Sequence, residues 1–381
     1  MGARRRALVI LVSLMVATVG TALLLIAASG SLGPRSARRG TQVAETRAVD
    51  LGLFKGEVLV WAVGGLSPTE VARVRDSSRV AAISAVRTGL LPLASGKRAY
   101  PVIPVEAMSV DPDAYAVAAG RAGGAFPGML ARGVVLSRTG ASLRKLRRGD
   151  HLPLTGNRSL TVGGVVDDRL LGGYEAAVDL ERGHRLGIDH VGYLLLLPRG
   201  SRDTLEAAVR GLLHGRKVAF RYPDQGPWFR AGDVTLPLAQ VKIRFGEFAV
   251  TSLAKPVPDP HWVQANIVTQ TVPVLGQVRC HRRVVADLAA VMADLRRDHL
   301  EGLVDVAAFR RVGGCLQQRP GRARPAGLSP QAWGIAFDLT GAGAPHLDKR
   351  LIAAMARHGF SWGGRWLQRA PGRFQWVGAG A

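Results

Sequence analysis

Residues Ser329 to Asp338 read Ser-Pro-Gln-Ala-Trp-Gly-Ile-Ala-Phe-Asp, and they carry the most specific spacing in the chain. The stretch places Ser, Gly, Ala and Asp in the pattern Ser-x-x-x-x-Gly-x-Ala-x-Asp. The run from His358 to Trp366 follows, reading His-Gly-Phe-Ser-Trp-Gly-Gly-Arg-Trp, and then Arg373-Phe374-Gln375-Trp376. Because three such runs in one order are hard to obtain by chance, they set the expectation for the C-terminal third.

These runs resemble the zinc-peptidase family of D-alanyl-D-alanine carboxypeptidases and L-alanyl-D-glutamate endopeptidases. The resemblance covers roughly residues 265 to 378 and takes in Gly314-Cys315 and Arg319. It implies a small α+β domain around one zinc ion that cuts bacterial cell-wall peptides. Catalytic zinc takes three protein ligands and a water, and a glutamate in the family removes the proton from that water.

The residues that would perform this chemistry are mostly replaced. Asp338 matches the aspartate ligand, but Gln331 and Arg373 stand where the family has its histidine ligands. A neutral amide is a poor zinc ligand, and a guanidinium has no lone pair to offer. Gln375 replaces the general-base glutamate and accepts no proton at neutral pH. The family resemblance therefore predicts a pseudoenzyme with no cofactor, and zinc only if the site is unexpectedly intact.

The same resemblance implies a substrate-binding set made of Arg319, Ser329 and Trp362. Without zinc, the former metal cavity needs another cation beside its carboxylate. We expect Arg373 to pair with Asp338, because a buried carboxylate without a partner carries a heavy desolvation cost. The alternative is an Asp338 exposed at a widened cleft.

The N-terminal segment predicts a membrane anchor. Three arginines at residues 4–6 precede an uncharged run from Ala7 to Ser29. As a helix this run would be about 35 Å long, and a hydrocarbon core is about 30 Å thick. A cleaved signal peptide is the alternative. The leading arginines favour a cytoplasmic N-terminus, so we expect a single-pass protein of the cell membrane with most of the chain outside the cytoplasm.

Charge and cysteine content agree with that location. The net charge of +23 favours anionic partners, which are nucleic acid, acidic lipid or anionic wall polymers. An extracytoplasmic chain excludes nucleic acid from this set. The chain has two cysteines, Cys280 and Cys315, and we expect them to form a disulfide, which an exported protein permits.

The pattern of turns and apolar runs divides the chain into three parts. Residues 1–40 hold the arginine cluster, the anchor and a linker, and residues 41–255 read as a mixed α/β extracytoplasmic domain. Residues 256–381 form the α+β peptidase-like domain. The boundary lies at Lys255-Pro256-Val257-Pro258-Asp259-Pro260, because alternating prolines continue neither a helix nor a central strand. Expected strands are 56–63, 134–137, 160–166, 217–222 and 374–377, and expected helices are 67–76, 202–213, 284–297 and 345–358. We expect Ser67 to cap the first helix, Gly359 to be the C-cap of the last, and Gly156-Asn157 to form a hairpin turn before the strand 160–166.

The segment from Val134 to Asp168 is similar to the extracytoplasmic core domain of ABC permeases of the macrolide-exporter type, over about 35 residues. This second resemblance implies a protein-contact module. Three hypotheses follow for the function. The first is an anchored, inactive protein that binds cell-wall peptide, an anionic wall polymer or a protein partner. The second is an active metallopeptidase with altered ligands, and the third is a scaffold subunit of a membrane complex.

Overall fold

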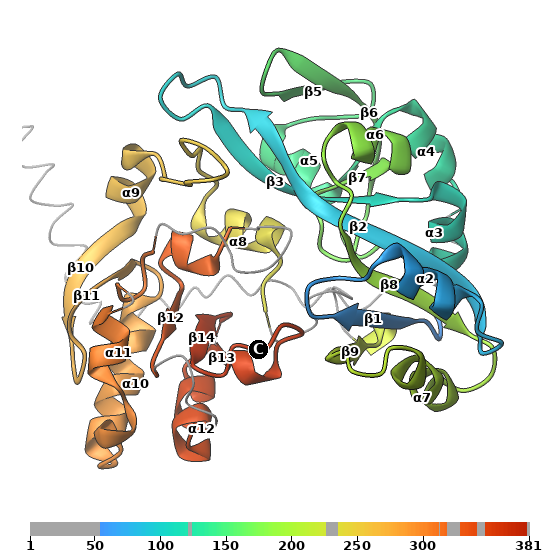
Figure 1. Ribbon diagram of the computed structural model, residues 1–381. Coiled ribbons are helices and arrows are strands. Elements are labelled where there is room, and N and C mark those ends of the chain that lie inside the picture. Colours follow the sequence, from blue (N-terminus) through green and yellow to red (C-terminus); the bar gives the residue numbers. More distant parts are fainter. Residues whose placement is uncertain are drawn as a thin grey trace, which may run out of the picture. The chain divides into compact units, whose positions relative to one another are not determined.

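A nine-stranded sheet organises the first half of the described chain (Figure 1). The computed structural model describes residues 54–120, 124–225, 235–311, 313–317, 328–340 and 347–378. Its strands are β1 (Val58–Ala62), β2 (Val80–Ala94), β3 (Val102–Val110), β4 (Val134–Ser137), β5 (His151–Leu154), β6 (Arg158–Val166), β7 (Ala176–Asp179), β8 (Val191–Pro198) and β9 (Val218–Arg221). The strand order is β3-β7-β4-β6-β5-β2-β8-β1-β9, and β2 also pairs with β3. Six strands therefore close into a ring, and β8, β1 and β9 extend from it.

The length of β2 lets one strand serve both parts of this sheet. Residues from Val80 to Arg87 pair with β8, whereas residues from Arg87 to Ala94 pair with β3. The ring side chains, such as Leu91, Val105 and Leu136, form a hydrophobic cluster of their own. Ala141 of the helix α5 (Arg138–Arg144) also packs into this cluster.

The extension of the sheet is buried on both faces. On β8, Leu194 and Leu196 pack into one cluster, and Tyr193 and Leu195 pack into another. This alternation is expected because neighbouring side chains of a strand point to opposite faces. The helices of this half are α2 (Pro68–Arg75), α3 (Pro112–Ala119), α4 (Phe126–Arg132), α5 (Arg138–Arg144), α6 (Leu180–Arg185) and α7 (Arg202–Leu212).

The second half of the described chain has two small antiparallel sheets (Figure 1). One pairs β10 (Ile267–Val272) with β11 (Gly276–His281), and the other has the order β12 (Ala336–Asp338), β14 (Arg373–Trp376), β13 (Phe360–Trp362). The longer helices are α8 (Leu238–Phe245), α9 (Pro260–Asn266), α10 (Val285–Arg297), α11 (Val306–Arg311) and α12 (Lys349–Arg357). The fold as a whole is mixed α+β, as the sequence predicts.

Several local predictions are confirmed. Ser67 caps α2 in a capping box with Glu70, and the turn at Gly156-Asn157 joins the antiparallel strands β5 and β6. The helix expected at 284–297 is α10. One detail is wrong, because His358 and not Gly359 is the C-cap of α12. The glycine comes one residue later with a φ of 79°, the backbone region that glycine tolerates best.

The predicted boundary at residue 255 falls between elements that pack together. Phe245, Phe248 and Val250 share one hydrophobic cluster with Trp262 and with the side chains of α10. The amide of Asp259 donates to the carbonyl of Ala249 at 2.9 Å. The division into domains at residue 255 stays a prediction.

The predicted anchor at residues 7–29 lies outside the described residues. Within the described ranges, no helix combines the length and the hydropathy that crossing a membrane requires.

Candidate functional site

The centre of the candidate site is an ion pair between two neighbouring strands. Asp338 on β12 lies opposite Arg373 on β14 in the sheet register. The Nε of Arg373 donates to Oδ1 of Asp338 at 2.9 Å, and Nη2 donates to Oδ2 at 2.9 Å. The side chains are only 16% and 19% exposed. The pair expected from the sequence is therefore present, and it is bidentate, the strongest geometry for these groups.

Gln331 completes the contacts of this carboxylate. It lies in a short 3-10 helix, η4 (Pro330–Trp333), and its Nε2 donates to Oδ2 of Asp338 at 3.4 Å. Ser329 caps η4, because its Oγ accepts from the amide of Gln331. With Arg373 and Gln331 both donating, the lone pairs of Asp338 are directed at protein donors.

Gly334 explains the spacing of the motif in backbone terms. It ends η4 with a φ of 68°, a conformation that costs other residues roughly 1–2 kcal/mol. A Cβ at this position would also lie 2.9 Å from the amide nitrogen of His281. The serine and the glycine of the motif thus start and stop one turn.

Gln375 lies two residues beyond Arg373 on β14, so both side chains point to the same face of the strand. It is 1% exposed, and within the described residues its Nε2 has no hydrogen-bond partner. A neutral, buried amide at this place accepts no proton near neutral pH.

Trp362 is held by its neighbours in the chain. Its Nε1 donates to the carbonyl of Pro371 at 2.7 Å. Its ring also lies so close to Gly364 that a Cβ there would be 2.2 Å from the indole. The role of Trp362 and Ser329 in binding a substrate stays a prediction, and Arg319 lies outside the described residues.

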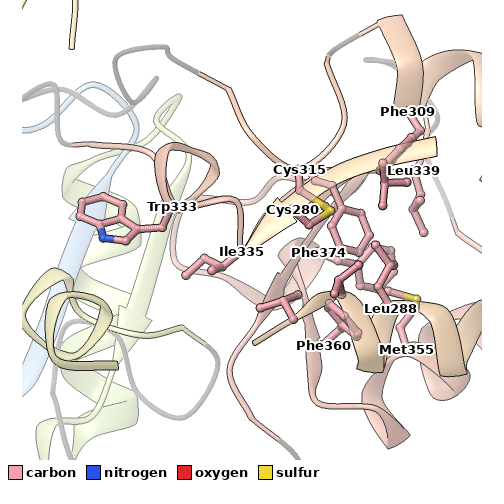
Figure 2. Close-up of a cluster of buried hydrophobic side chains, with 14 of the residues drawn as sticks. Cys280, Leu288, Phe309, Cys315, Trp333, Ile335, Leu339, Met355, Phe360 and Phe374 are labelled. Carbon is pink, nitrogen blue, oxygen red and sulfur yellow. A yellow bond between two sulfur atoms is a disulfide. The ribbon is translucent and has the colours of Figure 1, made fainter. Parts of the chain in front are cut away.

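The disulfide between Cys280 and Cys315 lies within the hydrophobic cluster of this half of the chain (Figure 2). Both cysteines are fully buried, and their Cα atoms are 5.0 Å apart. Just beyond it, the amide of Gln317 donates to the carbonyl of Gln331 at 2.9 Å. The covalent link therefore fixes the strand β11 beside the turn that carries Gln331.

Two other histidines of this region, His281 and His358, are engaged elsewhere or buried. His358 hydrogen-bonds through Nε2 to Asp294 at 2.8 Å, and this bond lowers the pKa of Asp294. Burial lowers the pKa of His281 to about 4. Over the ranges that the structure describes, no group of three or more His, Cys, Asp or Glu side chains is placed to hold a metal ion.

A buried charge network elsewhere was not predicted from the sequence. Lys242 on α8 is 1% exposed, and its Nζ lies 2.8 Å from Oε1 of the fully buried Glu175. Arg144 contacts Glu175 and Glu247, each at 2.7 Å. Burial raises the pKa of Glu175, but the charges of Lys242 and Arg144 more than reverse this, so the pKa is lowered. The only sequence signal is a lysine inside the apolar run Val241-Lys242-Ile243.

Comparison with known proteins finds similar solved structures only. No family model matches the chain, and no curated protein matches it. Among solved structures, the periplasmic region of MacB from Actinobacillus actinomycetemcomitans is similar, with 12% identity and a TM-score of 0.34 over 45% of this chain and 91% of that one. The extracellular domain of the noncanonic ABC-type transporter YknZ from Gram-positive bacteria is similar with 13% identity and a TM-score of 0.31, over 43% of this chain and 98% of that one.

These comparisons correct the family predicted from residues 329–376. The zinc-peptidase assignment is wrong: no family model matches the chain, and among the described residues no group of side chains is placed to hold the metal ion that the assignment requires. The predicted function in binding cell-wall peptide is wrong as well. So are the descriptions of the chain as a peptidase and as a peptidoglycan protein. The physical reason lies in the motif itself. Its serine caps a turn, its Gly334 ends that turn, and Gly364 makes room for a tryptophan. The spacing of these residues is therefore explained by the local geometry of the backbone.

Proposed function

We propose that this chain is a scaffold subunit of a membrane complex, with its described part outside the cytoplasm. The observation that carries the proposal is that the candidate site is occupied by its own side chains. Arg373 and Gln331 both donate to Asp338, so the polar residues expected to do chemistry hold the fold together. Because the carboxylate of Asp338 is already paired within the protein, the surface of the fold is better suited than this site to meet a partner.

Two features support the location. The disulfide between Cys280 and Cys315 is of the kind that persists in oxidising compartments. The uncharged run from Ala7 to Ser29 is long enough for one membrane span, and we propose it as the single-pass anchor. A protein partner in the same membrane would then meet the chain at high local concentration.

The region before residue 255 is the proposed contact module. Its six-stranded ring is closed by pairings between strands far apart in the sequence, such as β3 with β7 and β4 with β6. A closed ring leaves its hairpin turns as fixed projections. The large positive charge of the chain, +23, would attract an acidic partner surface over a distance.

The location is tested with a cysteine placed at the exposed Asn157 in the full chain. A membrane-impermeant maleimide added to intact cells should label Asn157→Cys as strongly as it does after permeabilisation. Labelling that requires permeabilisation would contradict the proposed location.

The scaffold role is tested by isolating the full chain from membranes after crosslinking. We expect one membrane protein to co-purify at a fixed ratio to the chain. A chain that stays uncrosslinked in membranes and is retained on purified cell wall would overturn the proposal. The variant Arg185→Ala, which alters an exposed ion pair with Glu181, is the control for loss of surface charge.

A further inference from the structure

A hollow opens where two hairpins of the ring diverge. Strands β2 and β5 pair at Leu93 and Leu154. Beyond this point the turn at residues 95–101 and the turn at residues 155–157 separate and leave a wide-open hollow of about 600 Å³ between them. Ligand clefts commonly measure about 300–1,000 Å³, so the hollow is large enough for a short peptide segment.

The walls of the hollow are basic and partly apolar. Its lining includes three cationic side chains and no acidic one. Among the lining residues are Lys97, Arg98, Pro101, Pro153, Asn157 and Arg158. An occupant that suits this surface carries negative charge and also an apolar group to cover the prolines.

Among the described residues, two of the three cations have no acidic partner. Lys97 pairs with the carboxylate of Asp259, whose side chain is only 4% exposed. Arg98 makes no ion pair within the described chain, and the side chain of Arg158 makes one long bond, from Nε to the carbonyl of Thr155 at 3.4 Å. Both arginines are exposed. Their planar guanidinium groups are therefore available to bind carboxylates in a bidentate manner.

The turn that carries Arg98 is held in place before any partner arrives. The amide of Ser95 donates to the carbonyl of Pro101 at 3.0 Å, and the amide of Lys97 donates to Oγ of Ser95 at 3.0 Å. The ion pair from Lys97 to Asp259 attaches the turn to the N-cap of α9. A preorganised surface loses less conformational entropy when it binds.

We propose that this hollow binds an acidic segment of the protein partner. Carboxylates of the segment pair with Arg98 and Arg158, and an apolar side chain of the segment covers Pro101 and Pro153. The proposal rests on the scaffold function proposed above. A peptide is favoured over a phosphate polymer because such a polymer has no apolar side chain to place against the two prolines.

The first test uses a photoreactive amino acid in the full chain in membranes. It is placed at Asn157 in the hollow, or at the exposed positions Val117 and Ile243 away from it. We expect a crosslink from position 157 that maps to a segment rich in Asp and Glu. Crosslinks to protein from 117 or 243 but none from 157 would overturn the hollow and leave the scaffold role standing. No protein crosslink from any position would refute the scaffold role itself.

The second test measures affinity with the purified full chain and a synthetic peptide of the crosslinked segment. The variant Arg98→Glu/Arg158→Glu should bind this peptide at least about tenfold more weakly. The control variant Arg148→Glu/Arg199→Glu changes the net charge equally at exposed sites that do not line the hollow, and it should bind like the unaltered chain. Equal affinity in both variants would overturn the proposal, as would inorganic polyphosphate that binds the hollow more tightly than the peptide.

Discussion

Replacing Asp338 by alanine should destabilise the fold, because it leaves Arg373 without its partner. Exposed ion pairs contribute about 0–1 kcal/mol, and breaking a fully buried pair costs about 3–5 kcal/mol. The two side chains are 16% and 19% exposed and share two hydrogen bonds of 2.9 Å. The expected loss lies between these limits, at about 2–3 kcal/mol.

A double-mutant cycle separates the pair from other effects of the substitutions. Asp338→Ala, Arg373→Ala and the double variant of the full chain are unfolded in urea and followed by tryptophan fluorescence. The interaction free energy of the pair should be about 1–2 kcal/mol. The exposed pair of Arg185 with Glu181, at 61% and 81% exposure, is the matched control and should give at most about 0.5 kcal/mol.

Two outcomes would refute the reasoning. The first is an Asp338→Ala variant with the same urea midpoint as the unaltered chain. The second is an interaction free energy no larger than that of the control pair. Either would mean that the carboxylate is solvated in the folded protein and that the site is not closed by its own residues.

Three further substitutions test the core. Lys242→Met leaves Glu175 with Arg144 as its remaining cation, and should lower the free energy of unfolding in urea by about 3–5 kcal/mol; a loss below about 1 kcal/mol would contradict this. His281 has a folded pKa of about 4, below its ordinary 6.5, so the unfolded chain binds its proton first. The contribution of neutral His281 to the free energy of unfolding is therefore complete above pH 6.5, and it falls by about 3 kcal/mol as the pH drops toward 4. In the variant His281→Phe, this part of the dependence of the free energy of unfolding on pH should be absent. Gly334→Ala should cost at least about 1–2 kcal/mol, measured by the same urea unfolding; an unchanged midpoint would show that the turn relaxes.

Local chemistry could be read from the sequence wherever neighbouring residues fix the backbone. Ser67 with Pro68 predicts the start of α2, and Gly156-Asn157 predicts the turn between β5 and β6. The Asp338 pair could also be predicted, because a desolvated carboxylate requires a cation and Arg373 was the candidate at hand. In each case the determining contact lies within a few residues or follows from one strong electrostatic requirement.

The pairing of distant elements could not be predicted in this way. The ring depends on β3 with β7 and β4 with β6, and many pairings of short apolar strands satisfy the same alternation. Lys242 and Glu175 are 67 positions apart, and neither residue signals the other in the sequence. The family prediction failed for a related reason, since Ser329 and Gly334 serve a turn that proteins of different families can contain.

The positive charge of the chain is distributed in two distinct ways, and this difference bears on its function. Where cations are buried, as with Lys242 and Arg144, acidic side chains neutralise them within 3 Å. At the hollow, Arg98 and Arg158 stay exposed with no acidic residue in the lining. A compositional bias toward arginine accounts for many exposed guanidinium groups. It does not account for cations that lie together at the ordered turn 95–101, beside the exposed Pro101 and Pro153. The interior charges are explained by the fold, and those at the hollow are the ones that the proposed acidic segment would bind.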